Sequence, residues 1–130
     1  MEKRRQRQIL IVEDEEALAR FVGWELESAG FEVHAEGRGE AALSYAAEHR
    51  PDLVILDLRL PDMHGYQVCR ELRKLFHPWD VPILMLTGMD KPIDQIRGFA
   101  HGADAYLTKP CEPTELFKTI SLLFGETASV

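Results

Sequence analysis

Short runs of apolar residues alternate along the chain with longer segments in which apolar residues recur every three or four positions. A short apolar run bounded by turn residues predicts a buried strand, whereas the wider spacing predicts a helix with one buried face. The predicted strands are Gln8–Val12, Phe31–His34, Val54–Leu58, Val81–Leu86 and Ala105–Thr108. The predicted helices are approximately Glu15–Ala29, Arg38–His49, Tyr66–Phe76, Asp90–His101 and Pro113–Phe124, and Asp90 is expected to cap the fourth. This regular alternation indicates a single α/β domain with a parallel five-stranded sheet.

The composition of each predicted strand indicates its place in the sheet. The first, third and fourth strands are almost continuously apolar, which is typical of strands buried on both faces at the centre of a parallel sheet. The second and fifth strands are shorter and mixed, so we expect them at the edges. With right-handed crossovers, these positions predict a doubly wound (βα)5 domain with the flavodoxin-like strand order 2-1-3-4-5.

Chemically active side chains follow four of the predicted strands. Glu13 and Asp14 follow the first strand, Asp57 ends the third, Thr87 follows the fourth and Lys109 follows the fifth. The carboxyl ends of parallel strands meet at one edge of the sheet, where ligands of such folds bind. The sequence therefore predicts that three carboxylates, a hydroxyl and an ammonium converge on one site.

This set of side chains is suited to phosphoryl transfer. Glu13, Asp14 and Asp57 would repel one another unless a cation lies between them. Carboxylate oxygens with open coordination positions suit Mg²⁺, while Lys109 can pair with a carboxylate or with a phosphoryl oxygen. A carboxylate nucleophile, a divalent metal and an ammonium are the groups needed to transfer a phosphoryl group to an aspartate.

Composition excludes several classes of protein. The chain has 130 residues, of which 45% are hydrophobic, and no apolar run approaches the roughly 18 residues of a membrane helix. No signal-peptide core follows the first residues, so a cytoplasmic location and no membrane partner are expected. The net charge is −7, and because residues 1–7 form a basic tail, the acidic body argues against direct nucleic-acid binding. Cys69 and Cys111 lack metal-site spacing and are expected to remain unpaired.

Several short motifs, in order and each at a predicted strand end, give a specific resemblance. They are Glu13-Asp14, Asp57, the turn Leu60-Pro61-Asp62-Met63-His64-Gly65, Thr87-Gly88, Gly102-Ala103-Asp104, Tyr106 and Lys109-Pro110. With these motifs the sequence resembles the receiver domain of two-component response regulators over residues 8–124. Residues 1–7 and 125–130 are then tails, and the resemblance also implies a cis Lys109–Pro110 peptide bond.

The resemblance implies a role for each site residue. Asp57 would accept a phosphoryl group from a sensor histidine kinase or a histidine phosphotransfer protein. Asp14, Asp57 and the backbone carbonyl of Arg59 would bind Mg²⁺, with Glu13 contacting the ion directly or through water. Thr87 and Lys109 would hold the phosphoryl oxygens.

The implied output is a switch rather than turnover of a substrate, so an enzyme is not expected. Thr87 would move towards the phosphoryl group, and Tyr106 would move into the space it leaves. The surface reporting this change would be residues 90–124, and it would control an unknown output domain or partner. A phosphorylation-dependent dimer is one implied form of the output. Ala105 and Thr114 stand where winged-helix regulators usually carry Asp and Arg, so we expect this surface to bind a different partner or to dimerise differently.

Two other functions of the same topology fit the residues less well. A flavin-binding module needs a loop that accepts phosphate after the first strand, whereas Glu13, Asp14, Glu15 and Glu16 would repel it. Proteins that resemble aspartate-based phosphatases carry an Asp-x-Asp signature at the end of the first strand. The segment Asp57-Leu58-Arg59 lacks the second aspartate of that signature. Six residues follow Phe124. We therefore expect no output domain here, which leaves open a stand-alone signalling protein or a receiver cut from a longer regulator.

Four further residues affect the interpretation of the surface and the site. Arg59, two residues after Asp57, is a long cation that could shield an acyl phosphate from water, and so affects its lifetime. Cys111 stands where the family commonly has an aromatic residue. Trp24 and Trp79 are interpreted as partly buried packing residues.

Overall fold

A parallel five-stranded sheet forms the centre of the computed structural model, which describes residues 5–126. Its strands are β1 (Gln8–Val12), β2 (Glu32–Glu36), β3 (Leu53–Leu56), β4 (Ile83–Thr87) and β5 (Ala105–Thr108), in the order β2-β1-β3-β4-β5. The helices are α1 (Glu16–Ser28), α2 (Gly39–His49), α3 (Gly65–Leu75), α4 (Pro92–Ala100) and α5 (Pro113–Leu123). The predicted fold and strand order are therefore confirmed. Residues 1–4 and 127–130 of the two predicted tails lie outside the described residues.

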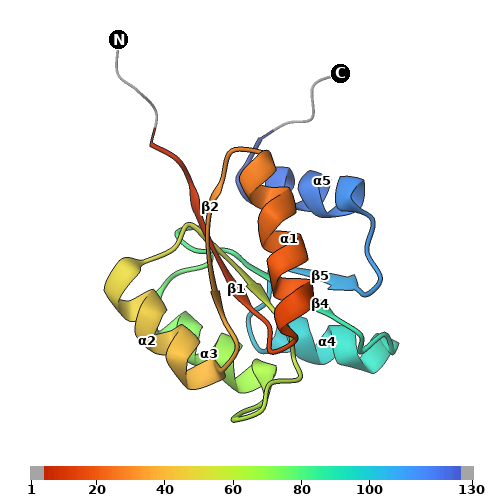
Figure 1. Ribbon diagram of the computed structural model, residues 1–130. Helices are drawn as coiled ribbons and strands as arrows, with labels where there is room; N and C mark the ends of the chain where they lie inside the picture. Colours follow the sequence, from red (N-terminus) through yellow and green to blue (C-terminus); the bar gives the residue numbers. More distant parts are fainter. Residues whose placement is uncertain (1–4, 127–130) are drawn as a thin grey trace.

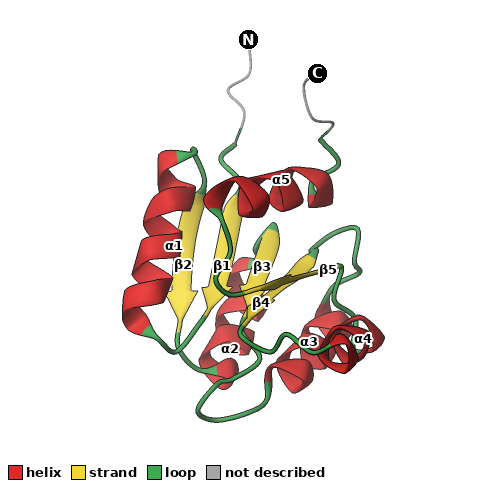
Figure 2. Cartoon of the chain, turned by 90° about the vertical axis from the view of Figure 1, so that its right-hand side faces the viewer, coloured by secondary structure: helices red, strands yellow, loops and turns green. Residues whose placement is uncertain are grey.

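The helices cover both faces of the sheet. In Figure 1, α1 and α5 lie on one side of the strands and α2 and α3 on the other, and Figure 2 looks onto the face that carries α1 and α5. Side chains of β1, β3 and β4 alternate between the two cores, and nearly all of them are fully buried. The side chains of β2 and β5 are mostly half-buried, as expected for edge strands. Both faces of the central strands are thus dry, which explains why their sequences are continuously apolar.

The two cysteines lie in different cores. Cys69 is buried with the α2 and α3 side chains, whereas Cys111 packs at the border of the core beneath α1 and α5. Both are free thiols, as predicted. The sheet separates them, so the distance needed for a disulfide cannot be reached.

The start of α4 differs from the prediction. Asp90 was expected to cap this helix, but the helix begins at Pro92 and the cap position is occupied by Lys91. The carboxylate of Asp94, in the first turn, accepts a hydrogen bond of 3.1 Å from the backbone N–H of Lys91. An acid at the third helical position can reach back in this way, so the predicted Asp90 cap is wrong.

The two tryptophans are surface residues rather than partly buried ones. Trp24 is 65% exposed and Trp79 is 79% exposed. On α1 the buried stripe is narrow and consists of Ala19, Val22, Gly23 and Leu26. A helix on a sheet buries only one stripe of its surface, and Trp24 lies outside that stripe. The prediction that both tryptophans are partly buried packing residues is therefore wrong.

Arg73 ties three separate segments together on the α3 side of the sheet. Its guanidinium donates hydrogen bonds of 2.8 Å to the carbonyl oxygens of Gly102 and Val81, and it pairs with the carboxylate of Asp104. That carboxylate also accepts a 2.8 Å hydrogen bond from the backbone N–H of Ile83. These contacts join the last turn of α3 to the start of β4 and to the loop before β5.

Candidate phosphoacceptor site

Three carboxylates meet at the carboxyl edge of β1 and β3. Glu13 and Asp14 directly follow β1 and Asp57 directly follows β3, and these strands are paired neighbours in the sheet. Each of the three carboxylates contributes one oxygen atom to a cluster, and these three atoms lie within 4.8 Å of one another. Glu13 and Asp57 are buried, whereas Asp14 is exposed. The backbone N–H of Asp57 donates a 2.9 Å hydrogen bond to the carbonyl of Val12, which fixes the two strand ends relative to each other.

The ammonium of Lys109 lies against two of these carboxylates. Its Nζ donates to Oδ2 of Asp57 at 2.9 Å and also to Oε1 of Glu13. Burial disfavours the charged ammonium, but the hydrogen bonds to Glu13 and Asp57 outweigh it, and the pKa of Lys109 is raised. Burial also raises the pKa of Glu13, although the hydrogen bond from Lys109 works against this. The lysine therefore provides the positive charge that keeps these crowded acids together.

Thr87 and Arg59 complete the rim of the site. Thr87 is fully buried at the end of β4, and its carbonyl accepts a 2.9 Å hydrogen bond from the backbone N–H of Lys109. The next residue is Gly88, and no atom beyond its two chain neighbours lies within 4 Å of the place where its Cβ would be. Space is therefore open next to Thr87 at the end of β4. The backbone N–H of Arg59 donates to Oδ1 of Asp57 at 3.3 Å, and the Arg59 residue is exposed.

The loop after Asp57 is held by contacts that cross the fold. The carboxylate of Asp62 accepts hydrogen bonds of 3.0 Å from the N–H of Glu40 and 2.8 Å from that of Gly39, at the start of α2. These backbone donors lower the pKa of Asp62. A Cβ on Gly65 would lie 2.6 Å from the carbonyl oxygen of Asp57, so only glycine permits this close approach. The role of Asp62 was not predicted, because nothing local in the sequence links it to Glu40.

The donor set fits a hard divalent cation. The cluster offers three carboxylate oxygens close together, and one of the carboxylates is exposed to solvent and able to admit water ligands. Mg²⁺ prefers such oxygen ligands and usually keeps several waters. The residues therefore fit a magnesium site, with Lys109 supplying positive charge beside it.

Comparisons with known proteins agree with this geometry. Residues 9–121 match the family described as the response regulator receiver domain. The chain belongs to this family. It is 41% identical over 110 residues to the "alkaline phosphatase synthesis transcriptional regulatory protein PhoP" of Bacillus subtilis, covering 85% of this chain and 45% of that protein. It is 40% identical over 119 residues to the "DNA-binding dual master transcriptional regulator RpaA" of Synechocystis, covering 92% and 49%. The receiver domain thus spans about half the length of these curated relatives.

Solved structures give the same result. The chemotaxis protein CheY4 of Vibrio cholerae has a TM-score of 0.85 and 33% identity, with 92% of this chain and 99% of that chain covered. The beryllofluoride-activated N-terminal receiver domain of RstA from Klebsiella pneumoniae has a TM-score of 0.86 and 31% identity, covering 91% and 98%. The receiver domain is therefore a member of a family of regulatory domains that act as phosphorylation-dependent switches. The cis Lys109–Pro110 peptide bond implied by the family resemblance is present.

Tyr106 of this receiver domain is directed towards the loop between β4 and α4. Its hydroxyl donates a 2.6 Å hydrogen bond to the carbonyl of Met89, two residues after Thr87. Its ring lies next to that of Phe99 on α4, with 6.5 Å between centroids. Burial raises the pKa of the Tyr106 phenol to about 12. The side chain therefore connects β5 with the segment that leads from the site to α4.

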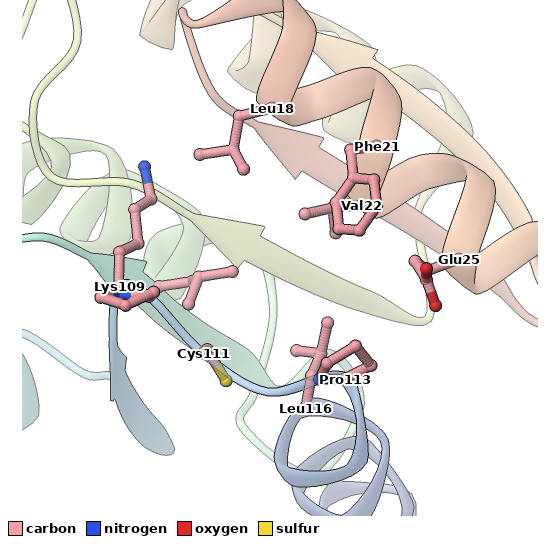
Figure 3. Close-up of a pocket in the computed structure, with 10 residues that line it drawn as sticks. Leu18, Phe21, Val22, Glu25, Lys109, Cys111, Pro113 and Leu116 are labelled. Atoms are coloured by element: carbon pink, nitrogen blue, oxygen red, sulfur yellow. The ribbon is translucent and has the colours of Figure 1, made fainter.

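An apolar groove runs beside the carboxylates between α1 and α5. It has a volume of about 380 Å³, and Figure 3 shows side chains of α1 on one side facing those of α5 on the other. The lining residues are Leu18, Phe21, Val22, Glu25, Leu86, Lys109, Pro110, Cys111, Pro113 and Leu116. Because Lys109 lines the groove and also contacts Asp57, this apolar surface adjoins the site.

None of the described helices is both long and apolar enough to cross a membrane.

Proposed function

We propose that Asp57 is the phosphoacceptor of this receiver domain and that its phosphodonor is a phosphohistidine of a sensor histidine kinase or a histidine phosphotransfer protein. The observation that carries the proposal is the position of the Asp57 carboxylate. It is buried at the sheet edge, bonded to Lys109 and within reach of two further acids. A buried carboxylate in this setting is far more constrained than a surface acid, and it has both a cation and metal-binding oxygens beside it.

The transfer forms one bond and breaks another. A carboxylate oxygen of Asp57 attacks phosphorus, the phosphorus–nitrogen bond of the phosphohistidine breaks, and the imidazole leaves with the bonding electron pair. The product is an acyl phosphate on Asp57. Asp14, Asp57, the Arg59 carbonyl and Glu13 would hold Mg²⁺, which supplies charge neutralisation at the phosphoryl oxygens. Lys109 and the Thr87 hydroxyl would contact the remaining phosphoryl oxygens, and Arg59 would limit access of water to the acyl phosphate.

Acetyl phosphate tests the acceptor role without a kinase. Incubation with acetyl phosphate and Mg²⁺ should add one phosphoryl group to the chain, measured by intact-mass spectrometry. Removing Mg²⁺ with a chelator should strongly reduce the labelling. A chain that stays unlabelled under both conditions would contradict the proposed function.

Mg²⁺ should stabilise the fold because it relieves repulsion among the three acids. A ligand at ten times its dissociation constant stabilises by about 1.4 kcal/mol, so the thermal midpoint should rise by a few degrees. The Asp14→Ala variant should be at least as stable as wild type without Mg²⁺, because one repelling charge is gone, and should lose most of the response to Mg²⁺. Thermal melts with and without the ion measure both effects.

The matched control for this measurement is Glu48→Ala, which removes an exposed acid near the end of α2. It should respond to Mg²⁺ as wild type does. If Asp14→Ala responds equally well, Asp14 is not a metal ligand.

The proposed output surface is formed by α4, β5 and α5. On α4 it carries the exposed apolar side chains of Ile93, Ile96 and Phe99. Apolar side chains gathered on an exposed helix are typical of a protein-binding surface. Because Ala105 and Thr114 replace the charged residues usual in winged-helix regulators, we propose that this surface binds a different output partner or forms a different dimer.

Beryllofluoride, which mimics the phosphoryl group, should change this surface. With Mg²⁺ and beryllofluoride, the largest amide shifts away from the site should fall within residues 90–124, measured by heteronuclear NMR. The Thr87→Ala variant should bind beryllofluoride but show a smaller response in this region. Shifts that spread instead over α2 and α3 would refute the assignment of the output surface.

A further inference from the structure

Helix α4 carries a buried glycine in its interior. Gly98 is the seventh of its nine residues and faces the sheet. Glycine is among the poorest helix formers, because it loses the most backbone freedom on folding. The space that a side chain would need is occupied: a Cβ at position 98 would lie 2.9 Å from Sδ of Met85 and 2.9 Å from Cδ2 of Tyr106. The glycine therefore allows α4 to lie directly on the tyrosine ring.

The two neighbours of Gly98 differ in how freely they can move. Met85 has a flexible thioether that can change rotamer at small cost. The ring of Tyr106 is rigid, and its hydroxyl is held by the carbonyl of Met89 at 2.6 Å. A methyl group at position 98 would also come within 3.1 Å of Cε2 on the same ring edge. Relief of this contact requires the ring to swing out or α4 to move away from β5.

We propose that Gly98 is a positioning residue that allows the Tyr106 ring to lie in an inward position, packed against α4 with its hydroxyl bonded to the carbonyl of Met89. This inference rests on the proposed function in one respect, since it treats Tyr106 as part of the switch. Because position 98 has no side chain, the surface of α4 there and the carbonyl of Met89 together form the inward site for the ring. A side chain at position 98 then shifts the balance of Tyr106 positions without touching the carboxylate site.

Stability measurements with a second substitution separate this role from ordinary helix propensity. In the wild-type background, Gly98→Ala should lower the thermal midpoint, because the methyl group collides with the ring. In a Tyr106→Ala background, the same substitution should raise the midpoint by about 2–4 °C, because the better helix former no longer meets the ring. This reversal of sign is the expected result. The same sign and size in both backgrounds would overturn the proposal.

The matched control is Gly23→Ala in the interior of α1. A Cβ there would lie 3.4 Å from Cγ1 of Val33, which is an acceptable packing distance. This variant should raise the thermal midpoint whether position 106 is tyrosine or alanine. A fall of the midpoint for Gly23→Ala in both backgrounds would show that helix glycines in this fold report something other than contact with Tyr106.

NMR supplies a readout that a merely structural role would not move. In Gly98→Ala the ring resonances of Tyr106 should shift before any phosphorylation, and the response of α4 amides to Mg²⁺ and beryllofluoride should fall at least twofold. Labelling of the chain by acetyl phosphate should be unchanged. Ring resonances that superimpose on those of wild type would refute the role of Gly98. Failure of wild type to be labelled would instead refute the proposed function, while the ring shift could still be scored.

Discussion

The Asp57→Asn variant should take up no phosphoryl group from acetyl phosphate under conditions that label the wild-type chain once. The substitution preserves the size of the side chain but replaces the attacking oxygen with an amide, which is not a nucleophile. Lys109 loses one anionic partner and keeps Glu13. The variant should therefore fold, and because one of three repelling acids is gone, its thermal midpoint should not fall greatly. Intact-mass spectrometry measures the labelling, and a thermal melt confirms the fold.

The control for this loss is Asp90→Asn. Asp90 is exposed in the loop between β4 and α4, so the same chemical change is made outside the carboxylate cluster. Its labelling should equal that of wild type. Labelling of Asp57→Asn at the wild-type level would show that another residue is the acceptor.

Arg73→Ala should strongly destabilise the fold. It removes the donors to two backbone carbonyls and leaves the carboxylate of Asp104 without its cationic partner. Breaking a largely buried ion pair by removing one partner costs about 3–5 kcal/mol, because the remaining charge is poorly solvated. Urea unfolding at neutral pH should show a reduction of that order in the free energy of unfolding.

Arg70→Ala is the matched control on the same helix. Arg70 is exposed, and substitutions at such surface positions usually change stability by no more than about 0.5 kcal/mol. If the two variants unfold at similar urea concentrations, the contacts of Arg73 are not what joins α3 to β4 and the loop before β5. A large effect confined to Arg73→Ala is the expected outcome.

The sequence by itself determined the fold and the membership of the site. The apolar runs of β1, β3 and β4 are long enough and continuous enough to indicate central strands, and the mixed sequence of β2 and β5 indicates edges. These positions give the strand order. The residues at the strand ends must then meet, since parallel strands bring their carboxyl ends to one edge of the sheet. Glu13, Asp14 and Asp57 do lie together there, with Lys109 bonded to two of them. Their chemical roles stay predictions until labelling and metal binding are measured.

Tertiary structure alone decided which side chains meet across segments distant in the chain. Asp62 caps α2 from a loop 22 residues away, and Asp94 rather than Asp90 supplies the carboxylate at the start of α4. The exposure of Trp24 and Trp79 and the contact between Gly98 and Tyr106 are of the same kind. Periodicity gives the face of a helix but neither the width of its buried stripe nor the distance between two packed backbones. Those quantities depend on how the helices lie on the sheet, and that is settled only when all the side chains are packed together.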